Sequence, residues 1–181
     1  MMVNGFQIEP GAELAGVDLS NTDLTNASLK DANLEGANLA GANLAGVTLF
    51  RANMSGANLA GANMAGAMSA VANLSGADLT GANMSGALLF RADLQNAILV
   101  GANLSAANMS GAWLYYTDLR NANLSGTDLS VAHLQNANLS RANMSGTDLF
   151  CANLTDAELT EANMTGVNLK GATMPDGTIN A

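Results

Sequence analysis

The chain repeats every five residues, without a gap, from Ala12 to Gly171. This stretch holds 32 consecutive pentapeptides in one register. The third residue of each pentapeptide, called the centre below, is Leu or Met in every repeat except the one centred on Ser69. The residue two before the centre is small and is usually Ala. A short fixed period of this kind predicts a repeat architecture, in which each unit contacts only its neighbours.

Each pentapeptide is expected to form a very short strand followed by a corner. The residues on either side of the centre are mostly polar, as Asn33 and Glu35 are beside Leu34. This is the in-out alternation of an extended segment. The residue two after the centre is commonly Gly or Asn, which accept the positive φ of a type II turn. A period of five fits neither a helix nor a simple strand, so strands and corners must alternate.

A second period, of twenty residues, predicts how many sides each coil has. Phe50, Phe90 and Phe150 are separated by multiples of twenty. One set of corner residues spaced by twenty is nearly all glycine, whereas another is mostly not: Asp31, Arg51, Val71, Arg91, Gly111, Val131, Cys151 and Gly171. Four pentapeptides per coil explain both observations. We therefore expect an all-β solenoid of about eight four-sided coils, roughly 40 Å tall, with the phenylalanines in one vertical column.

These repeats resemble the pentapeptide repeat family, whose motif is written A(D/N)LXX, and the resemblance runs from Ala12 to about Met174. It implies a right-handed quadrilateral parallel β-helix in which the central Leu and the small residue before it point inward. The ending ATMPDGTI, residues 172–179, is similar to the tails of many cyanobacterial members.

Three parts of the chain are expected. Residues 1–11, with Phe6 and Ile8, form an N-terminal cap, residues 12–171 form the β-helix, and residues 172–181 form a C-terminal cap or tail. Caps are needed because the ends of a solenoid expose strand edges that invite pairing.

Two details of the interior can also be predicted. Ser69 is expected to make a local kink and to hydrogen-bond to the main chain. The asparagines that precede the centre on one face are expected to hydrogen-bond up a ladder: Asn43, Asn63, Asn83, Asn103, Asn123, Asn143 and Asn163.

Charge and composition exclude several classes of function. The net charge is −9 and the pI is near 4.1, which argues against a nucleic-acid partner because such binders need clustered Lys and Arg. The start, MMVNGFQIEPG, lacks the basic and apolar segments of a secretory signal. No apolar run approaches the ~18 residues of a membrane span. We therefore expect a cytoplasmic protein with no membrane partner.

Catalysis is not expected. The single histidine, His133, occupies an outward position with no second histidine in the chain, and the single cysteine, Cys151, can form no internal disulfide. The recurring glycines lack the strand-to-helix context of a phosphate loop, and flat outer faces lack the concave pocket that enzymes use. We therefore predict no catalytic residue, no cofactor, no metal site and no small-molecule substrate.

In the middle of the solenoid (called the tower below), several outward positions hold apolar residues in place of polar ones. These residues mark a candidate interaction surface. It consists of one cluster on the phenylalanine face and a second on the next face: Phe50, Met68, Leu88 and Phe90, then Trp113, Tyr115 and Tyr116. Arg51 and Arg91 lie at the edge of the first cluster. Tolerated drift on a permissive scaffold explains the same irregularity and is favoured over an interface, and a seam between two shorter solenoids near 97–101 is a further explanation.

Two functions follow. The first is a non-enzymatic β-helical scaffold or protein-interaction module, whose partner is an unidentified protein or a second copy. The alternative, from the family resemblance, is a DNA-mimic modulator of DNA gyrase or of another nucleic-acid-binding protein. Against the alternative, only Asp128 and Asp148 place acids in adjacent coils among the positions before the centre. The loop insertion, phenylalanine centres and C-terminal dimerisation segment of gyrase-binding members do not occur here. Scattered threonines disfavour an ice-binding face.

Overall fold

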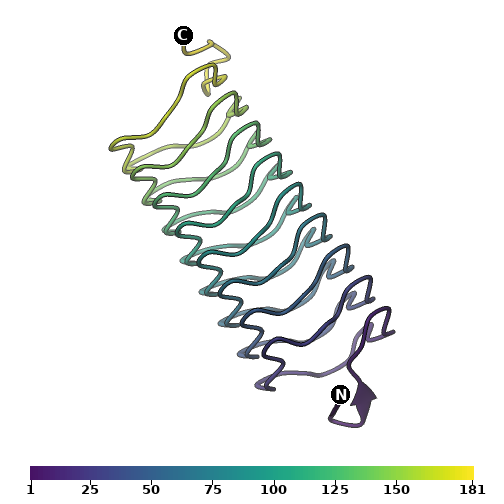
Figure 1. Ribbon diagram of the computed structural model, residues 1–181. Helices are drawn as coiled ribbons and strands as arrows, with labels where there is room; N and C mark the ends of the chain where they lie inside the picture. Colours follow the sequence, from purple (N-terminus) through teal and green to yellow (C-terminus); the bar gives the residue numbers. More distant parts are fainter.

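Successive coils of the chain stack along one axis in the computed structural model, which describes residues 1–181 (Figure 1). From Glu13 to Thr173, residues twenty apart pair through isolated parallel bridges, beginning with Glu13↔Asn33 and ending with Asn153↔Thr173. One coil therefore contains twenty residues, or four pentapeptides. The chain is a parallel β-helix solenoid, and the longer period of the sequence is the period of its backbone pairing.

Each short side is joined to its neighbours by hydrogen bonds in both directions. The amide of Leu34 donates to the carbonyl of Asn53 in the next coil at 2.6 Å, and the amide of Asn33 donates to Ala12 in the coil before at 2.9 Å. At the corner, the amide of Ala37 donates back to Leu34 at 3.0 Å, and Gly36 has a φ of 61°. A positive φ at the third residue of such a turn is that of type II. The predicted strand-and-corner unit is confirmed.

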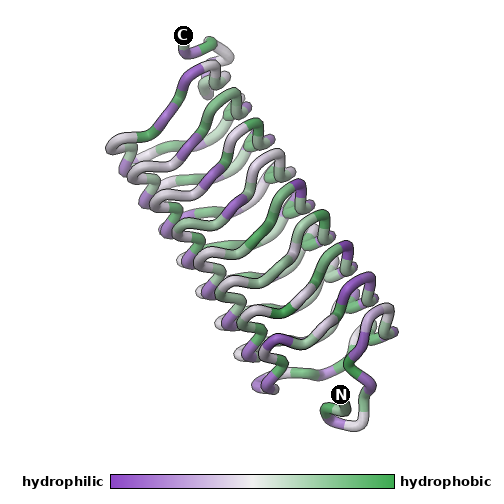
Figure 2. Tube along the Cα trace, viewed as in Figure 1, coloured by the Kyte–Doolittle hydropathy of each residue, from purple (hydrophilic) through white to green (hydrophobic).

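The centres and the small residues fill the interior. Leu104 and Leu124 are fully buried, and they belong to one cluster of 54 buried hydrophobic residues that runs the length of the tower. Figure 2 shows hydrophobic and hydrophilic residues alternating along the coils. Where Thr replaces Ala in the small position, its hydroxyl donates to the main chain, as Thr127 Oγ1 does to the Leu104 carbonyl at 2.8 Å.

The centres fall into four sets whose members are twenty residues apart; each set is called a face below and is named by a residue that it carries. The Phe face has its centres at Leu29, Leu49 and every twentieth residue to Leu169. The Trp face has centres from Leu14 to Leu154, the Arg face from Leu19 to Leu159, and the Asn face from Leu24 to Met164.

The ladder on the Asn face is confirmed. Asn63 Nδ2 donates to Asn43 Oδ1 at 3.0 Å, and the same bond recurs at every step up to Asn163, which donates to Asn143 at 3.0 Å. Each amide thus joins two coils, while its oxygen also accepts from a main-chain amide of its own corner, as Asn63 does from Ala65. The ladder is a structural feature of this face.

The predicted kink at Ser69 is wrong. The backbone pairs regularly there, because the Ser69 amide donates to the Leu88 carbonyl at 2.8 Å and Met68 bridges to both Thr48 and Leu88. The Ser69 side chain is fully buried, and its Oγ has no hydrogen-bond partner. Ser69 occupies a centre position, and its side chain points into the apolar core. The threonines of the small positions differ, because their hydroxyls reach main-chain carbonyls.

A seam near 97–101 is not present either. Ile98 bridges to Asp78 below and to Asp118 above, and the Leu99 amide donates to the Asp118 carbonyl at 2.7 Å. The pairing therefore runs through this region as it does elsewhere. Two of the three explanations for the mid-tower irregularity are left, an interface and drift.

The N-terminal end carries a small hairpin. Strand β1 (Met2–Val3) pairs antiparallel with β2 (Phe6–Gln7), and the amide of Ile8 donates to the carbonyl of Met1 at 2.7 Å. Ile8 is buried in the core, whereas Phe6 is exposed. Figure 1 shows the hairpin below the first coil.

The C-terminal end is more open. The tail turns back so that Thr173 pairs antiparallel with Ile179, which is exposed. On the other three sides, the amides of Leu159, Met164 and Leu169 have no backbone acceptor, and these three side chains are only partly buried. The capping roles of residues 1–11 and 172–181 stay predictions.

Candidate functional site

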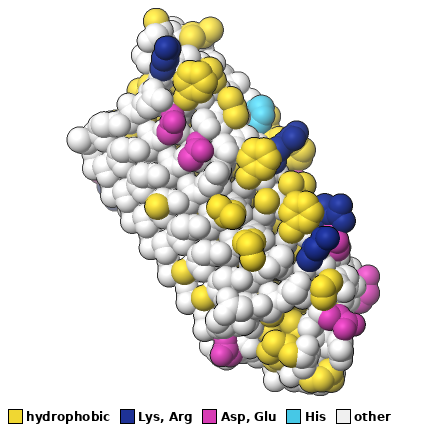
Figure 3. Space-filling model, in the orientation of Figure 1, with side chains coloured by type: hydrophobic (Ala, Val, Ile, Leu, Met, Phe, Trp, Pro, Cys, Tyr) yellow, Lys and Arg dark blue, Asp and Glu magenta, His cyan; other side chains and the backbone are white.

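The Phe face carries the first predicted cluster. Met68 and Leu88 bridge to each other in adjacent coils, while Phe50 and Phe90 lie two coils apart in the column beyond the centre, with Ala70 between them. The exposed fractions of these four large side chains run from 36% to 46%. Figure 3 shows hydrophobic side chains gathered with Lys and Arg on one face of the tower. The cluster is therefore brought together as the twenty-residue period predicts.

Cations line this cluster. Lys30 Nζ lies 5.9 Å and Arg51 Cζ 5.4 Å from the centre of the Phe50 ring, and Arg91 Cζ lies 6.0 Å from the centre of the Phe90 ring. Such contacts are attractive because the ring face is electron-rich. Arg51 also pairs with Asp31 at 2.6 Å, whereas Arg91 has no ion pair. Arg91 thus presents an unneutralised charge beside exposed apolar surface.

Exposed side chains at the corners extend the cluster beyond the residues predicted from the sequence. Val71 and Val131 are about half exposed and have φ values of 58° and 51°. A β-branched residue with positive φ is strained. Their signal in the sequence was an apolar, β-branched residue at a corner position, where the repeat commonly has Gly or Asn on the other sides of the coil.

The second predicted cluster lies around the next corner, on the Trp face. Trp113 is 43% and Tyr116 63% exposed, whereas Tyr115 is partly buried and stacks on His133 with ring centres 5.6 Å apart. His133 is therefore part of a surface stack. Arg91 packs beneath Gly111, two residues before Trp113, so the two clusters adjoin across this corner.

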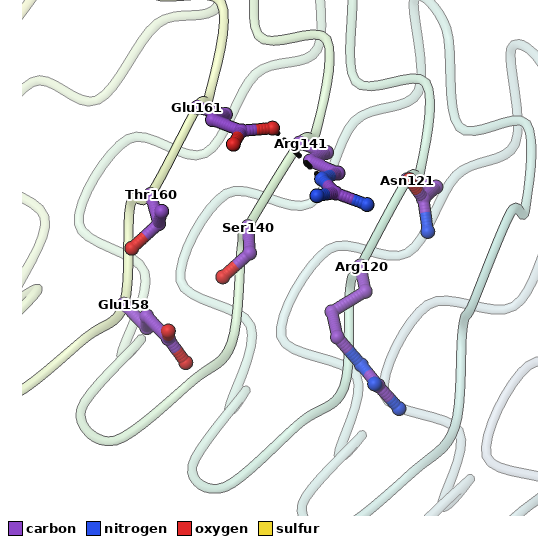
Figure 4. A pocket seen from close by; sticks show the side chains of 7 residues that line it. All are labelled: Arg120, Asn121, Ser140, Arg141, Glu158, Thr160 and Glu161. Atoms are coloured by element: carbon purple, nitrogen blue, oxygen red, sulfur yellow. Dashed lines mark hydrogen bonds and ion pairs between the residues drawn. The ribbon is translucent and has the colours of Figure 1, made fainter.

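A polar pocket of about 270 Å³ lies on the Arg face (Figure 4). Seven residues line it, none hydrophobic: Arg120, Asn121, Ser140, Arg141, Glu158, Thr160 and Glu161. Arg141 Nε donates to Glu161 at 2.8 Å, and Arg120 Nη2 donates to Asp118 at 2.6 Å. Both guanidinium groups are thus neutralised within the protein. The long side chains that form this pocket gave no signal in the sequence.

The Arg120 ion pair makes a testable prediction about pH. Hydrogen bonds and charge from Arg120 hold the pKa of Asp118 below its ordinary value of 3.8. Because the folded pKa lies below the unfolded one, ionised Asp118 stabilises the fold above about pH 3.8, and this stabilisation is lost as pH falls through the lowered value. We expect Arg120→Ala to raise the pKa of Asp118 toward 3.8, measured by NMR titration of its carboxyl carbon. An unchanged midpoint would contradict this assignment.

No three His, Cys, Asp or Glu side chains stand close enough together to hold a metal ion. Cys151 is a free, exposed thiol. No helix in the structure has the length and apolar character to cross a membrane.

Comparison of the sequence with known protein families identifies the family of this chain. The sequence profile described as Pentapeptide repeats matches in eight copies, over residues 11–39, 27–66, 52–91, 72–111, 87–126, 114–149 and 151–175. The chain belongs to the pentapeptide repeat family. No curated protein matches the chain by sequence.

Solved pentapeptide repeat structures resemble the chain over most of its length. HetL of the cyanobacterium Nostoc sp. strain PCC 7120, described as involved in heterocyst differentiation regulation, is 29% identical, with 97% of this chain and 94% of HetL covered and a TM-score of 0.40. QnrB1, described as a plasmid-mediated fluoroquinolone resistance protein, is 18% identical, with coverages of 91% and 94% and a TM-score of 0.64. At that identity, the likeness to QnrB1 supports the shared pentapeptide repeat fold alone.

Proposed function

We propose that this protein is a non-enzymatic scaffold, a right-handed quadrilateral β-helix that binds a protein partner or a second copy through its Phe and Trp faces. The observation that carries the proposal is the contrast between faces. In the middle of the tower, outward positions hold Phe90 and Trp113, whereas the ladder position of the Asn face holds asparagine from Asn43 to Asn163.

Exposed aromatic and aliphatic side chains gathered on one region support an interface. Contiguous apolar surface is uncommon on a protein that acts alone, and aromatic residues with Arg are enriched where partners bind. Here the cluster combines Phe50 and Phe90 with Arg51 and Arg91, whose guanidinium groups lie near the rings. These are residue types that anchor protein interfaces.

The test compares two variants with the same new charge at matching positions. Phe90→Asp alters the Phe face, and Ser105→Asp alters the corresponding position of the Asn face. We expect Phe90→Asp to abolish capture of a saturable partner, or self-association seen by sedimentation, whereas Ser105→Asp leaves it unchanged. Equal behaviour of both variants, or a monomer that captures nothing, would contradict the proposal.

Modulation of DNA gyrase by DNA mimicry is the second candidate. It is supported by the net charge of −9 and by the fold shared with QnrB1, a fluoroquinolone resistance protein. The acids are dispersed, however: among the residues that precede centres, the bridge between Asp128 and Asp148 joins the one acidic pair in adjacent coils. A supercoiling assay with purified gyrase discriminates the two, because the scaffold proposal expects neither inhibition nor protection from quinolones.

A further inference from the structure

We propose that the Phe face binds an amphipathic α-helix whose apolar stripe is flanked by acidic residues and which lies along the tower axis. This inference rests on the proposed function and names the class of partner. The binding surface, called the Phe patch below, consists of an apolar group and three cations: Phe50, Met68, Val71, Leu88 and Phe90, with Lys30, Arg51 and Arg91.

The spacing of the Phe patch fits a helix better than a strand. Coils follow one another at about 4.8 Å, which is the distance between paired strands. A helix lying along the axis presents side chains of one stripe at steps of three or four residues, or about 4.5–6 Å. A strand presents side chains of one face about every 6.6–6.8 Å and falls out of step with the coils. One helical side chain can therefore meet each coil of the patch.

The Phe patch has a shallow depression in which such side chains can pack. Phe50 and Phe90 are about 10 Å apart, because two coil spacings separate them, and only the methyl group of Ala70 lies between them in the column. Met68 and Leu88 form the neighbouring column and are 42% and 46% exposed. An apolar side chain of a helix can enter above Ala70 and contact both rings.

Charge selects an acidic helix over a second copy of the chain. The protein has six Lys and Arg residues and a net charge of −9, yet three of these cations border the patch. Arg91 has no ion pair, and Asp31 is the acid that pairs with both Lys30 and Arg51. Two copies joined through this patch would bring their cations together. Carboxylates beside an apolar stripe would instead pair with Arg91 and complement the local positive charge.

Three residues at the corner of the Phe face have a backbone conformation that residues with side chains disfavour. Arg51, Val71 and Arg91 have φ values of 58°, 58° and 53°, where glycine is favoured. On the Asn face, Gly46 and Gly66 fill the corresponding corners. Glycine at the Phe-face corners would relieve strain, so the side chains there do not serve the stability of the fold. Positive φ also occurs at non-glycine corners of other faces, such as Arg141 and Glu161, so this strain accompanies the Phe patch and does not locate it.

The test uses two synthetic helical peptides of about 20 residues, long enough to span about 30 Å. Both carry one leucine stripe, flanked by Glu in one peptide and by Lys in the other. By fluorescence anisotropy, we expect the Glu peptide to bind saturably and at least about tenfold more tightly than the Lys peptide, and to weaken as salt rises from about 50 to 500 mM.

Three variants locate the binding. Arg91→Glu is expected to weaken the Glu peptide about tenfold, whereas Lys170→Glu, the same charge change at an unpaired cation four coils higher on the same face, leaves its affinity nearly unchanged. Val71→Gly is expected to raise the melting temperature and to weaken peptide binding. A purely structural role for Val71 would leave the affinity where it was.

Equal affinity for the two peptides, or no response to Arg91→Glu, would overturn the inference. If Phe90→Asp nevertheless abolished self-association or capture of another partner, the proposed function would stand and only the class of partner would be wrong. If neither the peptides nor any partner depended on Phe90, both proposals would fail.

Discussion

Leu104→Ala is expected to lower the free energy of unfolding by about 3–5 kcal/mol, measured by urea denaturation followed by circular dichroism. Leu104 is a fully buried centre in a middle coil, so its truncation leaves a cavity that the stacked coils cannot close. In a solenoid, the loss is felt at the interfaces with both neighbouring coils.

The matched control is Leu159→Ala, the same change at a centre in the open C-terminal coil. Leu159 is only partly buried and its amide has no backbone acceptor, so a smaller loss of about 1–2 kcal/mol is expected. Equal losses at the two positions would contradict the burial that the structure assigns to them.

Ser69→Leu is expected to raise the free energy of unfolding by about 2–4 kcal/mol, seen as a higher urea midpoint with the same slope. Burying a leucine side chain contributes roughly 1.5–3 kcal/mol. Removing a buried hydroxyl without a partner contributes about 1 kcal/mol more. Leu49 and Leu89 occupy the same position in the coils below and above, so the larger side chain would continue an existing column.

Ser69→Ala separates the two contributions. It removes the unpartnered Oγ but adds almost no volume, so a gain of about 1 kcal/mol is expected. Destabilisation by Leu together with stabilisation by Ala would mean that the core has contracted around Ser69 and is overpacked by a leucine. That result would contradict the prediction.

Much of the fold could be predicted because position in a solenoid depends only on the period. The spacing of Phe50, Phe90 and Phe150 by multiples of twenty residues placed them in one column, and parallel bridges between residues twenty apart confirm the register. Ser69 was misjudged because the period identifies its position but not its hydrogen-bond partners. A centre side chain points away from the main-chain carbonyls that the hydroxyl of Thr127 reaches.

The candidate site could be predicted in part. The twenty-residue period stacked Met68 and Leu88 in one column, as expected from the sequence. The approach of Arg51 to the Phe50 ring, and the stacking of Tyr115 on His133, depend on side-chain rotamers that no repeat specifies. The polar pocket between the arginines of the Arg face escaped prediction for the same reason, since long flexible side chains form it.

The twenty-residue coil has a consequence for how this molecule tolerates changes in length. Because the interior follows a period of five, inserting or deleting a single pentapeptide would leave every later Leu and Met in the core. The exterior follows a period of twenty, so the same change would rotate everything beyond it by a quarter turn, and Phe90 would no longer stand above Phe50. Only the gain or loss of whole coils keeps the side chains of each face in their columns. The arrangement of surface residues is therefore far more sensitive to insertions and deletions than the fold itself.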